Sequence, residues 1–60
     1  MEVNFINESS TLLQSSAAAR IVIPIKGSRI TIGNVNYIVS DIRYNYDFGT
    51  INIHLKLFKI

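Results

Sequence analysis

A chain of 60 residues with a net charge of +2 has room for one small domain, residues 1–60, with a modest core drawn from its 48% of hydrophobic residues. It has no cysteine and one histidine, so neither a disulfide nor a thiolate–metal site can stabilise it. The four carboxylates show no metal-ligand spacing, and we expect neither a metal nor another cofactor. Because small domains of this kind often gain stability from association, we expect a protein partner and leave a homo-oligomer open.

The start of the chain, Met1-Glu2-Val3-Asn4, carries an acid where a signal peptide would have Lys or Arg. No apolar run approaches the roughly 20 residues that a membrane span requires. These features predict a soluble cytoplasmic protein without membrane association. Isoleucine (11 residues) and asparagine (six) both have AT-rich codons, a skew associated with short phage and mobile-element proteins, for which the host cytoplasm would be the compartment.

The N-terminal third combines a weak alternation with a polar stretch. Val3 and Phe5 alternate with Glu2 and Asn4, which predicts a short strand over residues 1–6 at a sheet edge. From about residue 9 to residue 19 the pattern changes to serines, two leucines and three alanines. The alanines favour a helix, whereas the four serines compete for backbone hydrogen bonds. This segment is therefore either a long loop or a short helix.

After residue 19 the hydrophobic period becomes two, which indicates β-strands. Residues 20–25 predict a strand, and Pro24 places it at an edge or beside a bulge. Gly33-Asn34 separates two alternating segments and predicts a two-residue hairpin turn of type I′ or II′. The register that matches apolar with apolar residues pairs Ile32 with Val35, Ile30 with Tyr37 and Thr31 with Asn36.

A second hairpin is predicted around residues 47–50, with a four-residue loop in which Gly49 can adopt a left-handed conformation. The inward residues are odd-numbered up to Val39 and even-numbered from Ile42, so a β-bulge is required near Ser40-Asp41. In this arrangement Tyr37, Tyr44 and Tyr46 all face inward. The predicted pairs are Tyr46 with Ile51, Tyr44 with Ile53, Ile42 with Leu55, Asn45 with Asn52, Arg43 with His54 and Asp41 with Lys56.

No motif for catalysis is present, because the chain lacks the GxSxG, HExxH and P-loop signatures and its glycines are isolated turn residues. A triad would need His54 with Asp41 and a serine, but the predicted register places His54 beside Arg43 on a polar strand face. We therefore expect no enzymatic activity. Asp41 and Lys56 are expected to form a surface ion pair worth roughly 0–1 kcal/mol.

Four residues on the polar face are the candidate nucleic-acid contacts: Arg29, Arg43, His54 and Lys56. Small β-barrels bind single strands by combining basic grooves with stacking aromatic side chains. The predicted inward orientation of the tyrosines argues against this use of the face.

The candidate protein contacts are four apolar residues that the alternation does not place in the core: Ile38, Phe48, Phe58 and Ile60. Ile38 and Phe58 fall on polar faces, and Phe48 falls at a hairpin tip, where turns favour small polar residues. Either these residues form a contact or oligomer surface, or Ile38 and Phe58 lie beneath residues 7–19 and complete a second core.

The stretch from Ile32 to Ile42, IGNVNYIVSDI, resembles the turn and Tyr-x-Val-x-x-Ile strand of small SH3-like barrels, which are frequent among phage and bacterial accessory proteins. The resemblance implies a mainly β fold, a small antiparallel meander curled into an SH3-like barrel. An OB-like barrel ranks second because it needs longer strands.

Since fold does not imply function, we base the expected function on the residues and not on the fold. We expect a non-enzymatic protein-interaction module, a phage or mobile-element factor that binds and modulates a host protein. The alternatives are a small nucleic-acid-binding β-barrel and a structural component of a virion or other assembly.

Overall fold

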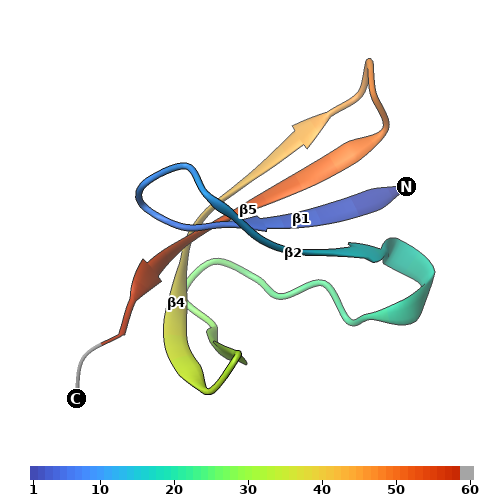
Figure 1. Ribbon diagram of the computed structural model, residues 1–60. Coiled ribbons are helices and arrows are strands. Elements are labelled where there is room, and N and C mark those ends of the chain that lie inside the picture. The colour runs from blue at the N-terminus through green and yellow to red at the C-terminus, as the bar shows by residue number, and fades with distance from the viewer. Residues whose placement is uncertain (59–60) are drawn as a thin grey trace.

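The computed structural model describes residues 1–58 and shows a small, nearly closed five-stranded β-barrel, compatible with an SH3-like fold (Figure 1). The mainly β fold predicted from the sequence is confirmed. Its elements are β1 (Glu2–Ile6), β2 (Leu12–Ala17), the 3-10 turn η1 (Ala18–Arg20), β3 (Arg29–Ile32), β4 (Val35–Asn45) and β5 (Thr50–Leu57).

The strands lie in the order β2-β1-β5-β4-β3, and β1 runs parallel to β5. The sheet is therefore mixed, and the prediction that the first strand is an edge strand was wrong. β1 lies between β2 and β5, and Val3 (0% exposed) and Phe5 (6% exposed) on this strand belong to the buried core.

Residues 12–17 form the strand β2, so the prediction of a loop or short helix over residues 9–19 was wrong for this part. β2 pairs antiparallel with β1. The connecting turn is held by Asn7, whose Oδ1 accepts hydrogen bonds from the backbone N–H groups of Ser9 and Thr11, both at 2.9 Å. Of the alanine run, Ala17 ends β2, and Ala18 and Ala19 form the short turn η1 with Arg20.

The strand predicted over residues 20–25 is absent, and residues 22–25 run as irregular chain from η1 toward β3. Ile21 and Ile23 pack against the core, whereas Val22 is 93% and Ile25 74% exposed. The alternation is right for Ile21, Val22 and Ile23 and wrong for Ile25, which it groups with the buried residues. Because Pro24 has no amide hydrogen to donate, this segment is poorly suited to a strand ladder.

The β3–β4 hairpin has the predicted register, with Ile32 opposite Val35 and Ile30 opposite Tyr37. Gly33 and Asn34 both have positive φ, 58° and 66°, as a type I′ turn requires. The predicted turn class is thus confirmed.

The predicted β-bulge is present in β4, where the register shifts between Val39 and Asp41. The Oγ of Ser40 donates a hydrogen bond to the backbone carbonyl of His54, at 3.0 Å. The bulge lets the inward face change from odd to even residue numbers and bends the long strand, which helps the sheet to curl.

The β4–β5 hairpin has the predicted loop length, but every predicted pair is displaced because the register differs by two residues. Asn45 pairs with Thr50, so the loop comprises residues 46–49 instead of 47–50. The last loop position is left-handed, with Gly49 at φ 64°. A loop over residues 47–50 would end on the β-branched Thr50, which tolerates that conformation poorly.

The core consists of side chains from β1, β4 and β5. Ile51, Ile53 and Leu55 of β5 are at most 1% exposed, since β5 is the central strand of the sheet. Val3 and Phe5 of β1 and Val39 of β4 complete the buried cluster.

Candidate protein-interaction surface

The end of the β4–β5 hairpin extends beyond the rest of the sheet (Figure 1). β1 begins opposite Thr50, and β3 pairs only with the first residues of β4. Tyr44 is consequently 54%, Tyr46 85% and Phe48 80% exposed. We call these three residues the aromatic tip.

The prediction that all three tyrosines face inward holds only for Tyr37, which is half-buried and packs against the core. Tyr44 lies opposite the buried Ile51, yet no element covers it at this end of the barrel. Alternation in the sequence gives the direction of a side chain. It does not reveal whether the opposing layer reaches that far.

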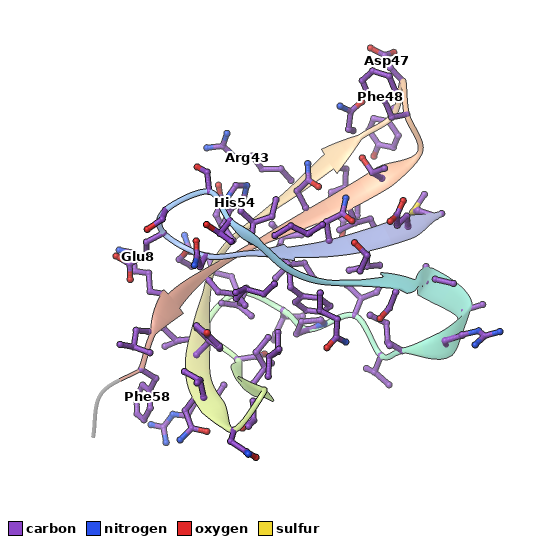
Figure 2. The ribbon with its side chains drawn as sticks, viewed as in Figure 1. Glu8, Arg43, Asp47, Phe48, His54 and Phe58 are labelled. Atoms are coloured by element: carbon purple, nitrogen blue, oxygen red, sulfur yellow. The ribbon has the colours of Figure 1, made fainter. Side chains whose placement is uncertain are left out.

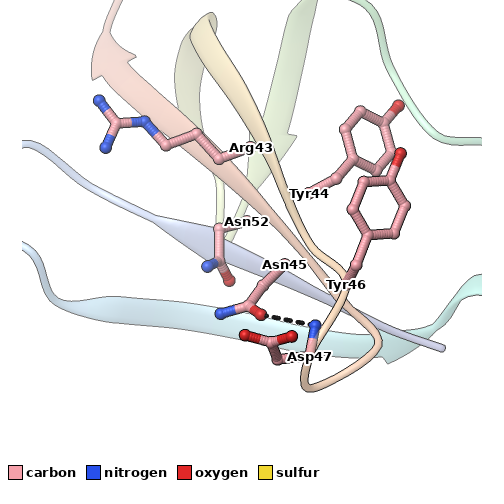
Figure 3. Close-up of a pocket in the computed structure, with 6 residues that line it drawn as sticks. All are labelled: Arg43, Tyr44, Asn45, Tyr46, Asp47 and Asn52. Atoms are coloured by element: carbon pink, nitrogen blue, oxygen red, sulfur yellow. Dashed lines mark hydrogen bonds between the residues drawn. The ribbon is translucent and has the colours of Figure 1, made fainter.

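The rings of Tyr44 and Tyr46 stack, with centroids 6.4 Å apart and planes 15° from parallel (Figure 3). Tyr44 belongs to β4 and Tyr46 is the first residue of the loop, and both rings project to the same side (Figure 3). The stack gives the aromatic tip a defined surface of two adjacent rings.

The loop that carries Phe48 is held by Asn45. Its Oδ1 accepts hydrogen bonds from the backbone N–H groups of Asp47, at 3.1 Å, and Phe48, at 3.3 Å. Next to this turn lies an open hollow of about 460 Å³. Its lining residues are Arg43, Tyr44, Asn45, Tyr46, Asp47 and Asn52 (Figure 3).

The predicted contact residues do not form one surface. Phe48 lies at the hairpin tip, and Phe58 lies at the opposite end of the molecule (Figure 2). Ile38 sits in a cross-strand row between Arg29 and Lys56, and both Ile38 and Phe58 are half-buried.

The Arg29 guanidinium carbon lies over the Phe58 ring, 4.4 Å from its centroid, which is a cation–π contact. The segment predicted as a possible cover for Ile38 and Phe58 contributes Leu13 to the main core. Ile60 lies outside the described residues.

The four candidate nucleic-acid residues are spread over the outer face of the sheet. Lys56 lies opposite Ile38, not Asp41, so the predicted Asp41–Lys56 pairing was wrong. Arg43 lies opposite Asn52 and not His54, because of the shifted register. His54 lies opposite Asp41.

Asp41 instead pairs with Arg43 on the same strand, with the Arg43 Nε 3.0 Å from Oδ2. The hydrogen bond from Arg43, followed by that from the backbone N–H of Ile42, lowers the pKa of the Asp41 carboxyl below its ordinary value. Both side chains are substantially exposed, so the pair contributes little to stability. It does partly neutralise one of the four basic candidates.

A row of polar side chains crosses the outer face and was not anticipated from the sequence. Ser15 Oγ donates to Asn4 Oδ1 at 2.7 Å, and Asn4 Nδ2 donates to Asn52 Oδ1 at 3.2 Å. These groups largely satisfy one another, which makes the row a structural feature of neighbouring strands. The asparagines are separated by 48 positions, so only the β1–β5 pairing reveals it.

Across residues 1–58 no three His, Asp or Glu side chains are grouped closely enough to hold a metal ion. The same part of the chain contains no helix that is long and apolar enough to cross a membrane. The fold and surface define a small five-stranded β-barrel with an exposed aromatic hairpin. No known protein family, curated protein or solved structure matches the chain.

Proposed function

We propose that this protein is a non-enzymatic protein-interaction module whose contact surface is the aromatic tip, Tyr44, Tyr46 and Phe48. The observation that carries the proposal is the exposure of these three rings, at 54%, 85% and 80%, on one projecting hairpin. Clustered exposed aromatic residues mark contact sites, and tyrosine is enriched among the residues that dominate binding energy.

The local structure supports a binding role because it holds the rings before a partner arrives. The two tyrosines stack, and Asn45 fixes the loop that carries Phe48. A surface organised in advance loses less conformational entropy on binding, and aromatic side chains have few rotatable bonds to immobilise.

Within this class, the finer assignment is an SH3-like barrel of the kind used by phages and mobile elements to bind and modulate a host protein. Its support is the nearly closed five-stranded barrel on a chain of 60 residues, together with the isoleucine and asparagine bias. A structural place in a virion or other assembly would use the same surface.

Affinity capture from a lysate of the source cells, read by quantitative mass spectrometry, tests the proposal. The wild type is compared with Tyr46→Ser/Phe48→Ser and with the control Val22→Ser, which removes a 93% exposed apolar side chain elsewhere. We expect a protein that the wild type and the control capture equally and that the tip variant loses. Equal capture by all three proteins, with the fold intact, would refute the role of the tip.

Binding to single-stranded nucleic acid is the second candidate, because the rings of Tyr44 and Tyr46 are exposed, while Arg29, Arg43 and Lys56 lie on the opposite, outer face of the sheet. Stacking platforms with basic grooves bind single strands with steep salt dependence. Fluorescence anisotropy with labelled oligonucleotides at low and physiological salt separates the candidates. Tight binding that weakens steeply with added salt and requires Tyr46 would replace the protein-binding proposal.

A further inference from the structure

The last residues of β5 have a paired strand on one side only. The β1 ladder ends at Ile6, opposite His54, whereas β5 continues to Leu57. On its other side β5 is paired as far as Leu57, which lies opposite Tyr37 of β4. The edge of β5 that faces β1 therefore has no paired residue of β1 beyond His54.

The backbone N–H of Leu57 points to this free edge. In an antiparallel pair, successive residues of a strand direct their backbone groups to opposite sides. The N–H of the next residue, Phe58, donates to the Asn36 carbonyl at 2.9 Å, so the Leu57 N–H is directed away from β4. An outward N–H of this kind is a group to which a further strand can bind.

A carboxylate meets this N–H in place of a strand. Glu8 lies in the turn between β1 and β2, beside the end of β5 (Figure 2). Its Oε1 accepts the hydrogen bond from the Leu57 N–H at 3.2 Å. The two residues are 49 positions apart, so this contact depends on the fold and not on the local sequence.

The space beside Leu57 is open. The Leu57 side chain is 49% exposed, and Glu8 is exposed as well. A hollow of about 310 Å³ lies next to them, lined by Asn7, Glu8, Ser9, Tyr37 and Leu57. Access to the Leu57 N–H is therefore limited by the Glu8 side chain and not by packed core residues.

We propose that Glu8 guards this edge: its carboxylate occupies the Leu57 N–H and so keeps a second copy of the chain from pairing with the end of β5. Proteins commonly protect free strand edges with charged side chains, because an unpaired edge is a template for other strands. An ionised carboxylate suits this role, since it satisfies the N–H and offers no donor to the carbonyl groups of an incoming strand. The proposal does not depend on the aromatic tip.

Sedimentation equilibrium of the purified full chain, from about 1 µM to 1 mM, measures self-association. Glu8→Ala removes the acceptor, and the matched control Glu8→Gln loses the same charge but keeps an oxygen that can accept the N–H. We expect Glu8→Ala to associate at least about tenfold more tightly than the wild type, and Glu8→Gln to stay within about threefold of it. Pairing through any other strand is common to the three proteins and does not affect the comparison.

Leu57→Pro tests the edge itself, because proline has no N–H to donate and β4 does not use this one. In the Glu8→Ala background, Leu57→Pro should return association to the wild-type level. Leu57→Thr in the same background also removes the apolar side chain but keeps the N–H, so it should leave the added association in place.

Amide hydrogen exchange of the wild type gives a test that no variant's folding can affect. The Leu57 amide should be protected from exchange although no strand pairs with it on that side. An unprotected Leu57 amide would overturn the proposal. So would a Glu8→Ala protein that associates no more tightly than the wild type or Glu8→Gln, or added association that Leu57→Pro does not remove.

Discussion

Tyr44 and Tyr46 stack at the far end of β4, where their side chains are 54% and 85% exposed. A stacked pair in the core would be a stability feature. Here the rings lie outside the buried cluster of the barrel, so their arrangement bears mainly on what the protein contacts.

Tyr46→Ser should therefore change the free energy of unfolding by less than about 1 kcal/mol, since an exposed ring loses little on truncation. Urea denaturation followed by circular dichroism measures the change. Phe48→Ser, which removes another exposed ring, should behave in the same way. A loss of more than about 2 kcal/mol for either variant would mean that the ring supports the fold.

Ile53 should be far more sensitive, because it is 0% exposed at the centre of β5. Ile53→Val should cost about 0.5–1.5 kcal/mol and Ile53→Ala about 2–5 kcal/mol, the latter enough to unfold much of a small domain. Val22→Ala, at a 93% exposed position, is the matched control and should stay within about 0.5 kcal/mol. Similar costs at both positions would contradict the assignment of the core.

Gly49 should resist substitution because its φ is 64°. Gly49→Ala is expected to cost about 1–2 kcal/mol, the penalty of placing a Cβ in the left-handed region. Gly49→Asn should cost less, because asparagine visits that region more readily. Thermal unfolding of the two variants decides the matter, and equal stability of Gly49→Ala and wild type would show that the loop has another conformation.

Ser40→Ala should cost about 0.5–1.5 kcal/mol, because it removes the hydrogen bond from Oγ to the His54 carbonyl at the bulge. Ser9→Ala, at an exposed position in the β1–β2 turn, serves as the control and should be nearly neutral. Denaturant unfolding compares the two. If Ser40→Ala were also neutral, the bond would have no part in stabilising the bulge.

Asp41 should make stability depend on pH in acid. Its pKa is lowered in the folded state by Arg43 and then by the Ile42 N–H, so the folded protein binds this proton less readily than the unfolded chain. The resulting stabilisation is present above the ordinary pKa of 3.8 and is lost as the pH falls through the lower folded value.

An NMR titration of the Asp41 carboxyl carbon measures this shift directly. Arg43→Gln removes the largest cause and should move the midpoint upward toward 3.8. A midpoint that Arg43→Gln leaves unchanged would contradict the assigned ion pair.

Much of the fold could be predicted because apolar alternation and turn residues act over short distances. Gly33-Asn34 determined the β3–β4 register, and the change of parity after Val39 located the bulge. The predicted β4–β5 register was wrong by two residues. Alternation cannot detect such an error, because a shift of two residues leaves every side chain on the same face of the sheet. The left-handed requirement met by Gly49 distinguishes the two registers.

The features that failed depend on distant parts of the chain. β1 lies beside β5, some 48 residues away, and no local pattern specifies that parallel pairing. β2 is a strand despite its weak alternation, because its backbone pairs with β1. Tyr44 is exposed because β3 ends before it reaches this residue. The sequence of β4 gives no indication of where β3 ends.

For the candidate site, sequence alternation correctly singled out Phe48 as an apolar residue at a hairpin tip. The same alternation assigned Tyr44 and Tyr46 to the inner face, so it did not group them with Phe48. The structure brings the three onto one hairpin and places Phe58 at the other end of the barrel.

The most direct test of the aromatic tip as the contact surface is a chemical-shift map of the isotopically labelled protein, titrated with the partner recovered by affinity capture. The account predicts that the largest amide shifts fall on residues 44–50, and that Tyr46→Ser/Phe48→Ser abolishes them. Shifts centred on Arg29, Ile38 and Phe58, with residues 44–50 unaffected, would contradict it.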